Sequence, residues 1–133
     1  MAAALGAKLR GGEAIELVSD LGGGKTTFVK GLLKGMGSDE LASSPSFTLS
    51  NTYQAGELTL QHYDFYRLND PGILRDELAE AISDDKTVVV IEWADIVADV
   101  LDDKHLRVDI AVTGETGRRY SFSCGSSLAY LKP

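Results

Sequence analysis

A glycine-rich segment between Ser19 and Thr26 holds the residues with the clearest chemical potential. It reads Ser-Asp-Leu-Gly-Gly-Gly-Lys-Thr and nearly matches the phosphate-binding pattern G-x-x-x-x-G-K-[ST]. Glycines let a backbone wrap around a polyanion and point N–H groups at it, and the helix start adds partial positive charge. In such a loop Lys25 reaches the β- and γ-phosphates, and the Thr26 hydroxyl binds magnesium. The pattern therefore predicts binding of ATP or ADP with Mg²⁺. The residues expected to contact the nucleotide here are Asp20, Leu21, Gly22, Gly23, Gly24, Lys25, Thr26 and Thr27.

The first position of the pattern is Ser19, where the usual loop has glycine. Serine fits there only if the backbone angles suit a residue with a β-carbon. We expect this change to cost some affinity without abolishing the loop. The alternative interpretation is a glycine-rich turn that caps a helix and binds nothing. An apolar segment before the loop and an amphipathic segment after it favour the phosphate loop.

Two acidic residues follow segments that read as strands. Glu92 comes directly after the apolar run 88–91, and phosphate loops commonly take their magnesium-holding acid from the end of a neighbouring strand. Asp64 ends another such segment and is expected to orient the attacking water or to lie near the metal. The alternatives are a solvated strand end for Glu92, and a turn cap or an ion pair with Arg67 for Asp64. The candidate catalytic residues are therefore Lys25, Asp64 and Glu92, and the candidate metal ligands are Thr26 and Glu92.

Other polar and aromatic residues near these acids have less specific interpretations. Trp93 is expected either to be a core residue or, because it adjoins Glu92, to form a wall of the nucleotide pocket. His62 is expected to be a packed or hydrogen-bonded strand residue, since a lone histidine indicates little. Arg67 and Arg75 have the reach for phosphates, but pairing at the surface is the default expectation.

The elements that position these residues follow from the spacing of apolar side chains. Residues 1–10 are typical of the end of a helix that Gly11–Gly12 terminates. Residues 14–18 form a short apolar run, which predicts a buried strand. After the glycine-rich segment, residues 26–36 repeat apolar side chains at helical spacing, with Gly37 as the expected C-cap.

The middle of the chain predicts a strand pair, a helix and a central strand. Residues 47–53 and 58–65 read as strands around a turn at 54–57. A helix is expected to start at Asp70–Pro71 and to run through Ala81, because proline suits the first helical position. The β-branched run 87–91 is continuous, which is typical of a strand buried on both faces.

The last third predicts a terminal hairpin. A short helix is expected over 96–101, and residues 106–112 and 118–124 alternate on either side of a turn at 113–117. The sum of these elements predicts an α/β fold: a single P-loop NTPase domain over residues 1–133, with a mixed, mainly parallel sheet flanked by helices and a C-terminal β-hairpin.

Composition restricts the partners and the compartment. The chain has 133 residues, which suggests one domain, and a formal net charge of −7. An acidic chain is poorly suited to gripping nucleic acid alone, because phosphate contacts need lysine and arginine. The single cysteine, Cys124, cannot form an internal disulfide and is expected to be a small buried strand residue. We see neither a signal peptide nor a membrane-spanning run, so a cytoplasmic location is expected.

Four blocks in order resemble the TsaE family (also called YjeE), the bacterial P-loop ATPases of tRNA threonylcarbamoyladenosine synthesis. The blocks are the phosphate loop 19–27, Ser-Pro-Ser-Phe-Thr-Leu at 44–49, His-Tyr-Asp-Phe-Tyr-Arg-Leu at 62–68 and Ile-Glu-Trp at 91–93. The usual family patterns are GDLGAGKTT, SPTFTL, H-[FY]-D-x-YRL and [IV]EW. The resemblance covers nearly the whole chain.

The resemblance implies ATP hydrolysis in support of a complex with TsaD and TsaB, which modifies an adenosine beside the tRNA anticodon. It implies phosphate and magnesium roles for Lys25 and Thr26, a metal-site role for Glu92, and a need for Asp64 and Trp93 in activity. It also implies a switch-like loop at 44–48, and tRNA contact only through the complex.

Departures from the family pattern are Ser19 for glycine, Gly23 for alanine, and Ala94 where a proline is usual. We also expect the family's usual first strand to be missing before Met1.

Two other functions remain open on the residues alone. A P-loop kinase for a small molecule needs an acceptor pocket and an arginine-rich lid, and no segment of the sequence reads as such a lid. A non-enzymatic adaptor would bind nucleotide only to control docking, and would show binding without turnover. A translational GTPase is disfavoured because the Asn-Lys-x-Asp signature of guanine recognition does not occur.

Overall fold

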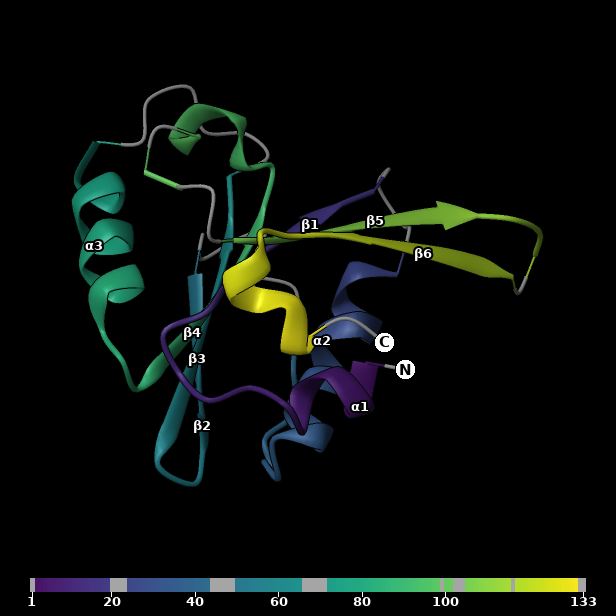
Figure 1. Cartoon of the computed structure of the whole chain (residues 1–133), viewed down its shortest axis with the longest axis horizontal. Coiled ribbons are helices and arrows are strands. Elements are labelled where there is room, and N and C mark those ends of the chain that lie inside the picture. The colour runs from purple at the N-terminus through teal and green to yellow at the C-terminus, as the bar shows by residue number, and fades with distance from the viewer. Residues whose placement is uncertain are drawn as a thin grey trace.

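The computed structural model describes residues 2–19, 24–43, 50–65, 72–98, 100–101, 105–115 and 117–131. The helical elements are α1 (Ala2–Gly6), α2 (Lys25–Gly35), α3 (Gly72–Ser83) and two 3₁₀ helices, η1 (Ala94–Val97) and η2 (Ser126–Leu131). The strands are β1 (Ala14–Val18), β2 (Ser50–Ala55), β3 (Leu58–Asp64), β4 (Thr87–Glu92), β5 (Leu106–Val112) and β6 (Arg118–Ser123). Helical elements and strands are interspersed along the chain, and β2–β3 and β5–β6 are consecutive strands (Figure 1).

The strands form one six-stranded sheet in the order β2-β3-β4-β1-β5-β6. The inner pairs β3–β4, β4–β1 and β1–β5 are parallel, and the outer pairs β2–β3 and β5–β6 are antiparallel hairpins. The expected α/β fold with a mixed, mainly parallel sheet and a C-terminal hairpin is therefore confirmed. Because the central strands are parallel, their carboxyl ends meet at one edge of the sheet.

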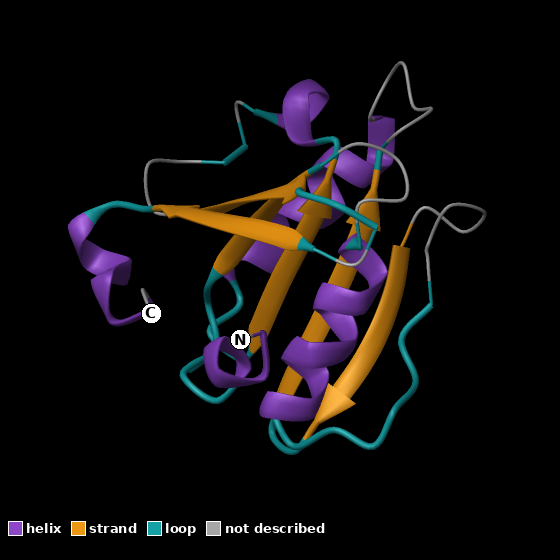
Figure 2. Ribbon diagram, turned by 90° about the vertical axis from the view of Figure 1, so that its right-hand side faces the viewer, coloured by secondary structure: helices purple, strands orange, loops and turns teal. Residues whose placement is uncertain are grey.

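Helices cover the two faces of the sheet unequally (Figure 2). The larger core joins α1, α2 and η2 to one face, through residues such as Leu5, Leu32 and Leu128. The smaller core joins α3 and η1 to the other face, through Leu78 and Val97. Helices on both sides of a sheet are what allow its middle strands to be apolar throughout.

Strand β4 lies in the middle of this arrangement and is buried along its whole length. Residues 88–91 have no exposed surface, and they alternate between the two cores. This confirms the prediction of a central strand buried on both faces. The consequence for function is that Glu92, the last residue of β4, is fixed at the end of the most deeply buried element of the fold.

Helix α2 begins one residue earlier than the sequence predicted, at Lys25, and ends at Gly35. Its end matches the expected cap, because the N–H groups of Gly37 and Ser38 donate to the carbonyls of Lys34 and Leu33. Helix α1 packs closely against it: a β-carbon at Gly35 would lie 1.9 Å from the Ala3 carbonyl oxygen. The short helix α1 therefore braces the helix that carries Lys25.

The N-terminal helix and the segment after β4 differ from the sequence expectations. The N-terminal helix ends at Gly6, and residues 7–12 form turns and bends before β1. The helix expected over 96–101 was wrong in position and type, because a 3₁₀ helix occupies 94–97 and tight turns follow it. These turns arise because the N–H of Val100 bonds to Val97 three residues back, as in a 3₁₀ turn.

The C-terminus also differs. Cys124 lies just after β6 and is half-buried, where a buried position within the strand was expected. The 3₁₀ helix η2, which follows it, was not predicted from the sequence. The expected strand start at 47–49 and the helix start at Asp70–Pro71 lie outside the described residues. Among the helices of the described ranges, none has the length and apolarity to cross a membrane.

Candidate active site

The candidate site lies at the edge of the sheet where the central parallel strands end. Strand β3 ends at Asp64 and β4 at Glu92, and the two residues are direct partners in the parallel register. Strand β1 ends at Val18, beside β4, and α2 starts at Lys25 a few residues later. The topology thus brings the three candidate catalytic residues to one edge, as the sequence predicted.

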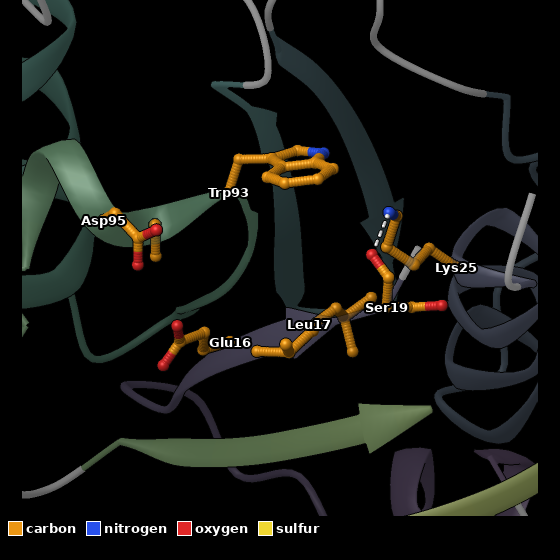
Figure 3. Close-up of a pocket in the computed structure, with 8 residues that line it drawn as sticks. Glu16, Leu17, Ser19, Lys25, Trp93 and Asp95 are labelled. Carbon is orange, nitrogen blue, oxygen red and sulfur yellow. Dashed lines mark hydrogen bonds between the residues drawn. The ribbon is translucent and has the colours of Figure 1, made fainter. Parts of the chain in front are cut away.

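Lys25 is the first residue of α2, and only 7% of its surface is exposed. Its ammonium donates to the carbonyl of Ser19 at 3.2 Å and lies 3.6 Å from Oε1 of Glu92 (Figure 3). The same ammonium is 5.1 Å from the centre of the Trp93 ring. A buried lysine is costly unless it is paired, so these three partners hold a positive charge where the strands end.

Glu92 is 4% exposed, and both of its carboxylate oxygens have partners. Oε1 faces Lys25, and Oε2 lies 2.5 Å from Nε2 of His62. His62 sits on β3 with no exposed surface, and no described group bonds its Nδ1. The interpretation of Glu92 as a solvated strand end is therefore wrong.

The expectation of a hydrogen-bonded His62 is confirmed, although its partner was not foreseen. The sequence offered one indication of the contact. In β3 the residues His62 and Asp64 share one face, and the parallel register sets Asp64 beside Glu92. A long acidic side chain at the end of β4 can therefore reach back to His62. The sequences of the two strands do not by themselves reveal the His62–Glu92 contact, because the register between β3 and β4 is set by tertiary packing.

Asp64 is 6% exposed and lies at the end of β3, two residues after His62. The structure brings it next to Glu92 at the backbone level. A carboxylate so far withdrawn from solvent needs hydrogen-bond or ionic partners. Arg67, the alternative partner, lies outside the described residues. The role of Asp64 in orienting water stays a prediction.

Trp93 is half-buried and has a positive φ of 57°, the one such value among the described non-glycine residues. A bulky side chain with this backbone conformation costs about 1–3 kcal/mol, and such strain is concentrated at functional sites. The indole stands on one side of a pocket of about 370 Å³, part of it open to solvent, with Lys25 and Ser19 across from it (Figure 3). The residues lining the pocket are Glu16, Leu17, Val18, Ser19, Lys25, Trp93, Ala94 and Asp95. Trp93 thus packs against the smaller core and also walls this pocket.

Of the expected phosphate loop, the structure describes Ser19 and the residues from Gly24 onward. Gly24 is the N-cap of α2 with a φ of +97°, a conformation that favours glycine. Thr26, in the first turn, is half-buried, and Thr27 is exposed. The residues expected to make the rest of the loop, Asp20, Leu21, Gly22 and Gly23, lie outside the described residues, as do 44–49. Their contacts with nucleotide remain predictions.

The oxygen atoms near the start of α2 suit magnesium more than a transition metal. Carboxylate and hydroxyl oxygens are hard ligands, and Mg²⁺ is usually held by one or two protein oxygens together with phosphates and water. Within the described ranges no three acidic, histidine or cysteine side chains gather to form a protein-only metal cage. Glu92 and Thr26 together offer the smaller number of oxygens that a nucleotide-bound magnesium ion needs.

Comparisons with known proteins agree on one family. A family model described as threonylcarbamoyl adenosine biosynthesis protein TsaE matches residues 1–120. The chain is 34% identical to TsaE of Bacillus subtilis over 112 residues, which is 84% of this chain and 70% of that protein. It is 38% identical to TsaE of Treponema pallidum over 114 residues, covering 86% and 84% of the two chains. In structure it is similar to Bacillus subtilis YdiB, with a TM-score of 0.72, 31% identity, and 98% of this chain and 81% of that chain covered. The chain therefore belongs to the TsaE family.

Proposed function

We propose that this chain is an ATP-binding and ATP-hydrolysing subunit that supports N6-threonylcarbamoyladenosine modification of tRNA, together with TsaD and TsaB homologues. Its relatives carry the name tRNA threonylcarbamoyladenosine biosynthesis protein TsaE. The phosphate-loop pattern at 19–26 supports nucleotide binding, and its strand–loop–helix setting is the usual one for such a loop.

The single observation that carries the proposal is the Lys25–Glu92 pair at the start of α2. A buried cation and a buried carboxylate, 3.6 Å apart, stand where parallel strands end and a helix begins. A phosphate group can replace Glu92 as the ionic partner of Lys25, because the charge of Lys25 and the helix N-terminus both favour an anion at this place. The carboxylate released from Lys25 is then available to a cation.

Glu92 and Thr26 are the residues that would hold magnesium. When bound with nucleotide, magnesium neutralises charge on the phosphates and stabilises the charge that develops during transfer. The role of the protein is to orient the Glu92 carboxylate. His62 does this, because its Nε2 lies 2.5 Å from Oε2 of Glu92, the oxygen that does not face Lys25. Lys25 would bind the phosphates, and Trp93 forms one wall of the pocket.

We assign the positioning of the attacking water to Asp64. It lies at the same strand edge as Glu92 and is shielded from bulk solvent. A carboxylate in this position orients a water molecule by accepting its hydrogen bond. We assign the hydrolytic role to Asp64 and the metal role to Glu92, because Glu92 is the acid that contacts the phosphate-binding lysine.

We base partner dependence on the charge of the chain and on the lack of a clear arginine-finger signal in its sequence. The chain has a net charge of −7 and is poorly suited to binding tRNA directly, so we assign tRNA contact to the partners. The proposed pathway also implies a cytoplasmic location. An activating arginine supplied by another protein is worth about 10³–10⁵ in rate for P-loop enzymes. We therefore expect slow hydrolysis by the isolated chain and faster hydrolysis in the complex.

The test measures nucleotide binding and turnover separately. Calorimetry with ADP and ATP, with and without magnesium, is expected to show binding in the isolated protein. Steady-state ATP turnover is then measured for the chain alone, with TsaD and TsaB homologues, and with tRNA added. Stimulation by the partners supports the proposal. Binding without turnover in the full mixture would instead identify an adaptor, and phosphate transfer to a small acceptor would identify a kinase.

A further inference from the structure

The terminal hairpin brings a second cation to the same edge of the sheet. Strand β5 is parallel to β1, and β6 returns antiparallel to β5. Arg118 is the first residue of β6, so it lies at the edge where β1 and β4 end, which is the edge that holds Lys25 and Glu92. The hairpin extends from the body of the protein beside β1 (Figure 1).

The alternation of side chains along β6 directs Arg118 toward α2. Phe122 and Tyr120 belong to the face that packs against the larger core, and the ring of Tyr120 lies 5.8 Å from the ring of Phe28 in α2. Side chains two residues apart share a face of a strand, so Arg118 is on this face as well. Arg118 comes two residues before Tyr120 in β6 and lies closer than Tyr120 to the start of α2.

Contact with the helix start is direct. A β-carbon at Gly24, the N-cap of α2, would lie 3.6 Å from Nε of Arg118. The guanidinium is half-buried, and its Nη1 donates to the carbonyl of Gly117 at 2.8 Å. In the part of the chain that the structure describes, no carboxylate pairs with Arg118. Arg107 of the same hairpin, by contrast, pairs with Asp109 at 3.1 Å.

This position is unfavourable for a cation unless an anion joins it. The start of a helix carries partial positive charge, which repels arginine and attracts negative groups. Lys25 adds a full positive charge in the first turn of the same helix. A half-buried guanidinium placed there without an acidic partner is explained if the usual partner is a ligand.

We propose that Arg118 binds the phosphate groups of the nucleotide at the start of α2, from the side opposite Glu92. This inference rests on the proposed nucleotide site. Guanidinium groups present several donors in a plane, which matches phosphate oxygens. Lys25 then grips the phosphates from the helix and Arg118 from the hairpin, so that the terminal hairpin becomes part of the binding site.

The test compares two adjacent arginines of β6. Arg118→Gln removes the charge and keeps most of the length, Arg118→Lys restores a charge, and Arg119→Gln is the control, because Arg119 is exposed on the opposite face. ADP and ATP affinities are measured by calorimetry at two salt concentrations, with adenosine as a ligand without phosphate. Thermal unfolding of the nucleotide-free variants checks the hairpin. Lys25→Ala is measured in parallel.

We expect Arg118→Gln to weaken ADP and ATP binding by about ten- to a hundredfold, the scale of one charge-assisted contact. Arg118→Lys should recover part of this loss, and Arg119→Gln should stay within about twofold of the wild type. Adenosine binding and the unfolding temperature should not change. If Arg118→Gln binds nucleotide as Arg119→Gln does while Lys25→Ala is impaired, the inference fails and the nucleotide site stands. If the wild type binds no nucleotide, both fail.

Discussion

The substitution Glu92→Gln separates two effects of one carboxylate. In the structure Oε1 of Glu92 lies 3.6 Å from the Lys25 ammonium. With an effective dielectric constant near 20, this attraction is about 4–5 kcal/mol before desolvation is counted. Desolvation of both buried groups offsets most of it. A phosphate group must nevertheless displace the Glu92 carboxylate from Lys25, and must then lie close to the negative charge of that carboxylate.

Glutamine keeps the shape and removes the charge. Without magnesium, we expect the variant to bind ADP up to about tenfold more tightly than the wild type, because about 1.4 kcal/mol of competition for Lys25 is removed. With magnesium, the wild type should gain affinity and the variant should gain less, since Glu92 is the proposed metal ligand. ATP turnover should fall by about 10²-fold or more, the scale of losing one preorganised transition-state contact.

Calorimetry with ADP in EDTA and in magnesium measures the first two effects, and steady-state turnover with the partner proteins measures the third. Glu16→Gln is the matched control, because Glu16 lines the same pocket but pairs with His105 at 3.1 Å. Equal magnesium-free affinity in the two variants, together with wild-type turnover in Glu92→Gln, would refute the assignment of Glu92.

Three further changes test the lysine, the helix packing and the C-terminus. Lys25→Ala should weaken magnesium–ATP binding by about 1.5–3 kcal/mol, the range for a charge-assisted hydrogen bond, and unchanged affinity by calorimetry would remove the phosphate-loop interpretation. Gly35→Ala should lower the free energy of unfolding, measured with denaturant, by about 1–3 kcal/mol, because the new β-carbon would lie 1.9 Å from the Ala3 carbonyl oxygen. The gain in helix propensity, about 1 kcal/mol, is too small to compensate. A stabilised variant would contradict this. Burial and a hydrogen bond to Glu13 raise the pKa of Tyr130 from 10.0 to about 12, so its contribution to stability is complete below pH 10 and is lost as the pH rises through 12. The stability difference between the wild type and Tyr130→Phe should therefore narrow above pH 10, and a difference that is independent of pH would show that Tyr130 does not titrate in this way.

Much of the fold followed from short-range patterns in the sequence. The continuous β-branched run 87–91 predicted the buried strand β4, and the alternating segments around 113–117 predicted the hairpin of β5 and β6. Both patterns are local and depend on burial alone. The 3₁₀ helix η1 was missed in its position because Trp93 adopts a positive φ that no residue preference indicates.

The candidate site was predicted less completely. Lys25 was proposed from the glycine-rich motif, and Glu92 and Asp64 were proposed because each ends a strand; the structure brings all three to one edge because parallel strand ends meet. The His62–Glu92 contact depends on the register between two strands that are far apart in sequence, and Arg118 depends on the return of a hairpin toward α2. Such contacts become visible only when the sheet order is known.

The most direct test of the central claim is tRNA modification in a reconstituted mixture of TsaD and TsaB homologues, tRNA, ATP and the threonylcarbamoyl donor system, followed over many turnovers. We predict that modification continues over many turnovers with this chain present, and does not do so when the chain is omitted or replaced by the Lys25→Ala variant. Modification that continues at the same rate without the chain, or with the variant in its place, would contradict a role for ATP hydrolysis by this protein.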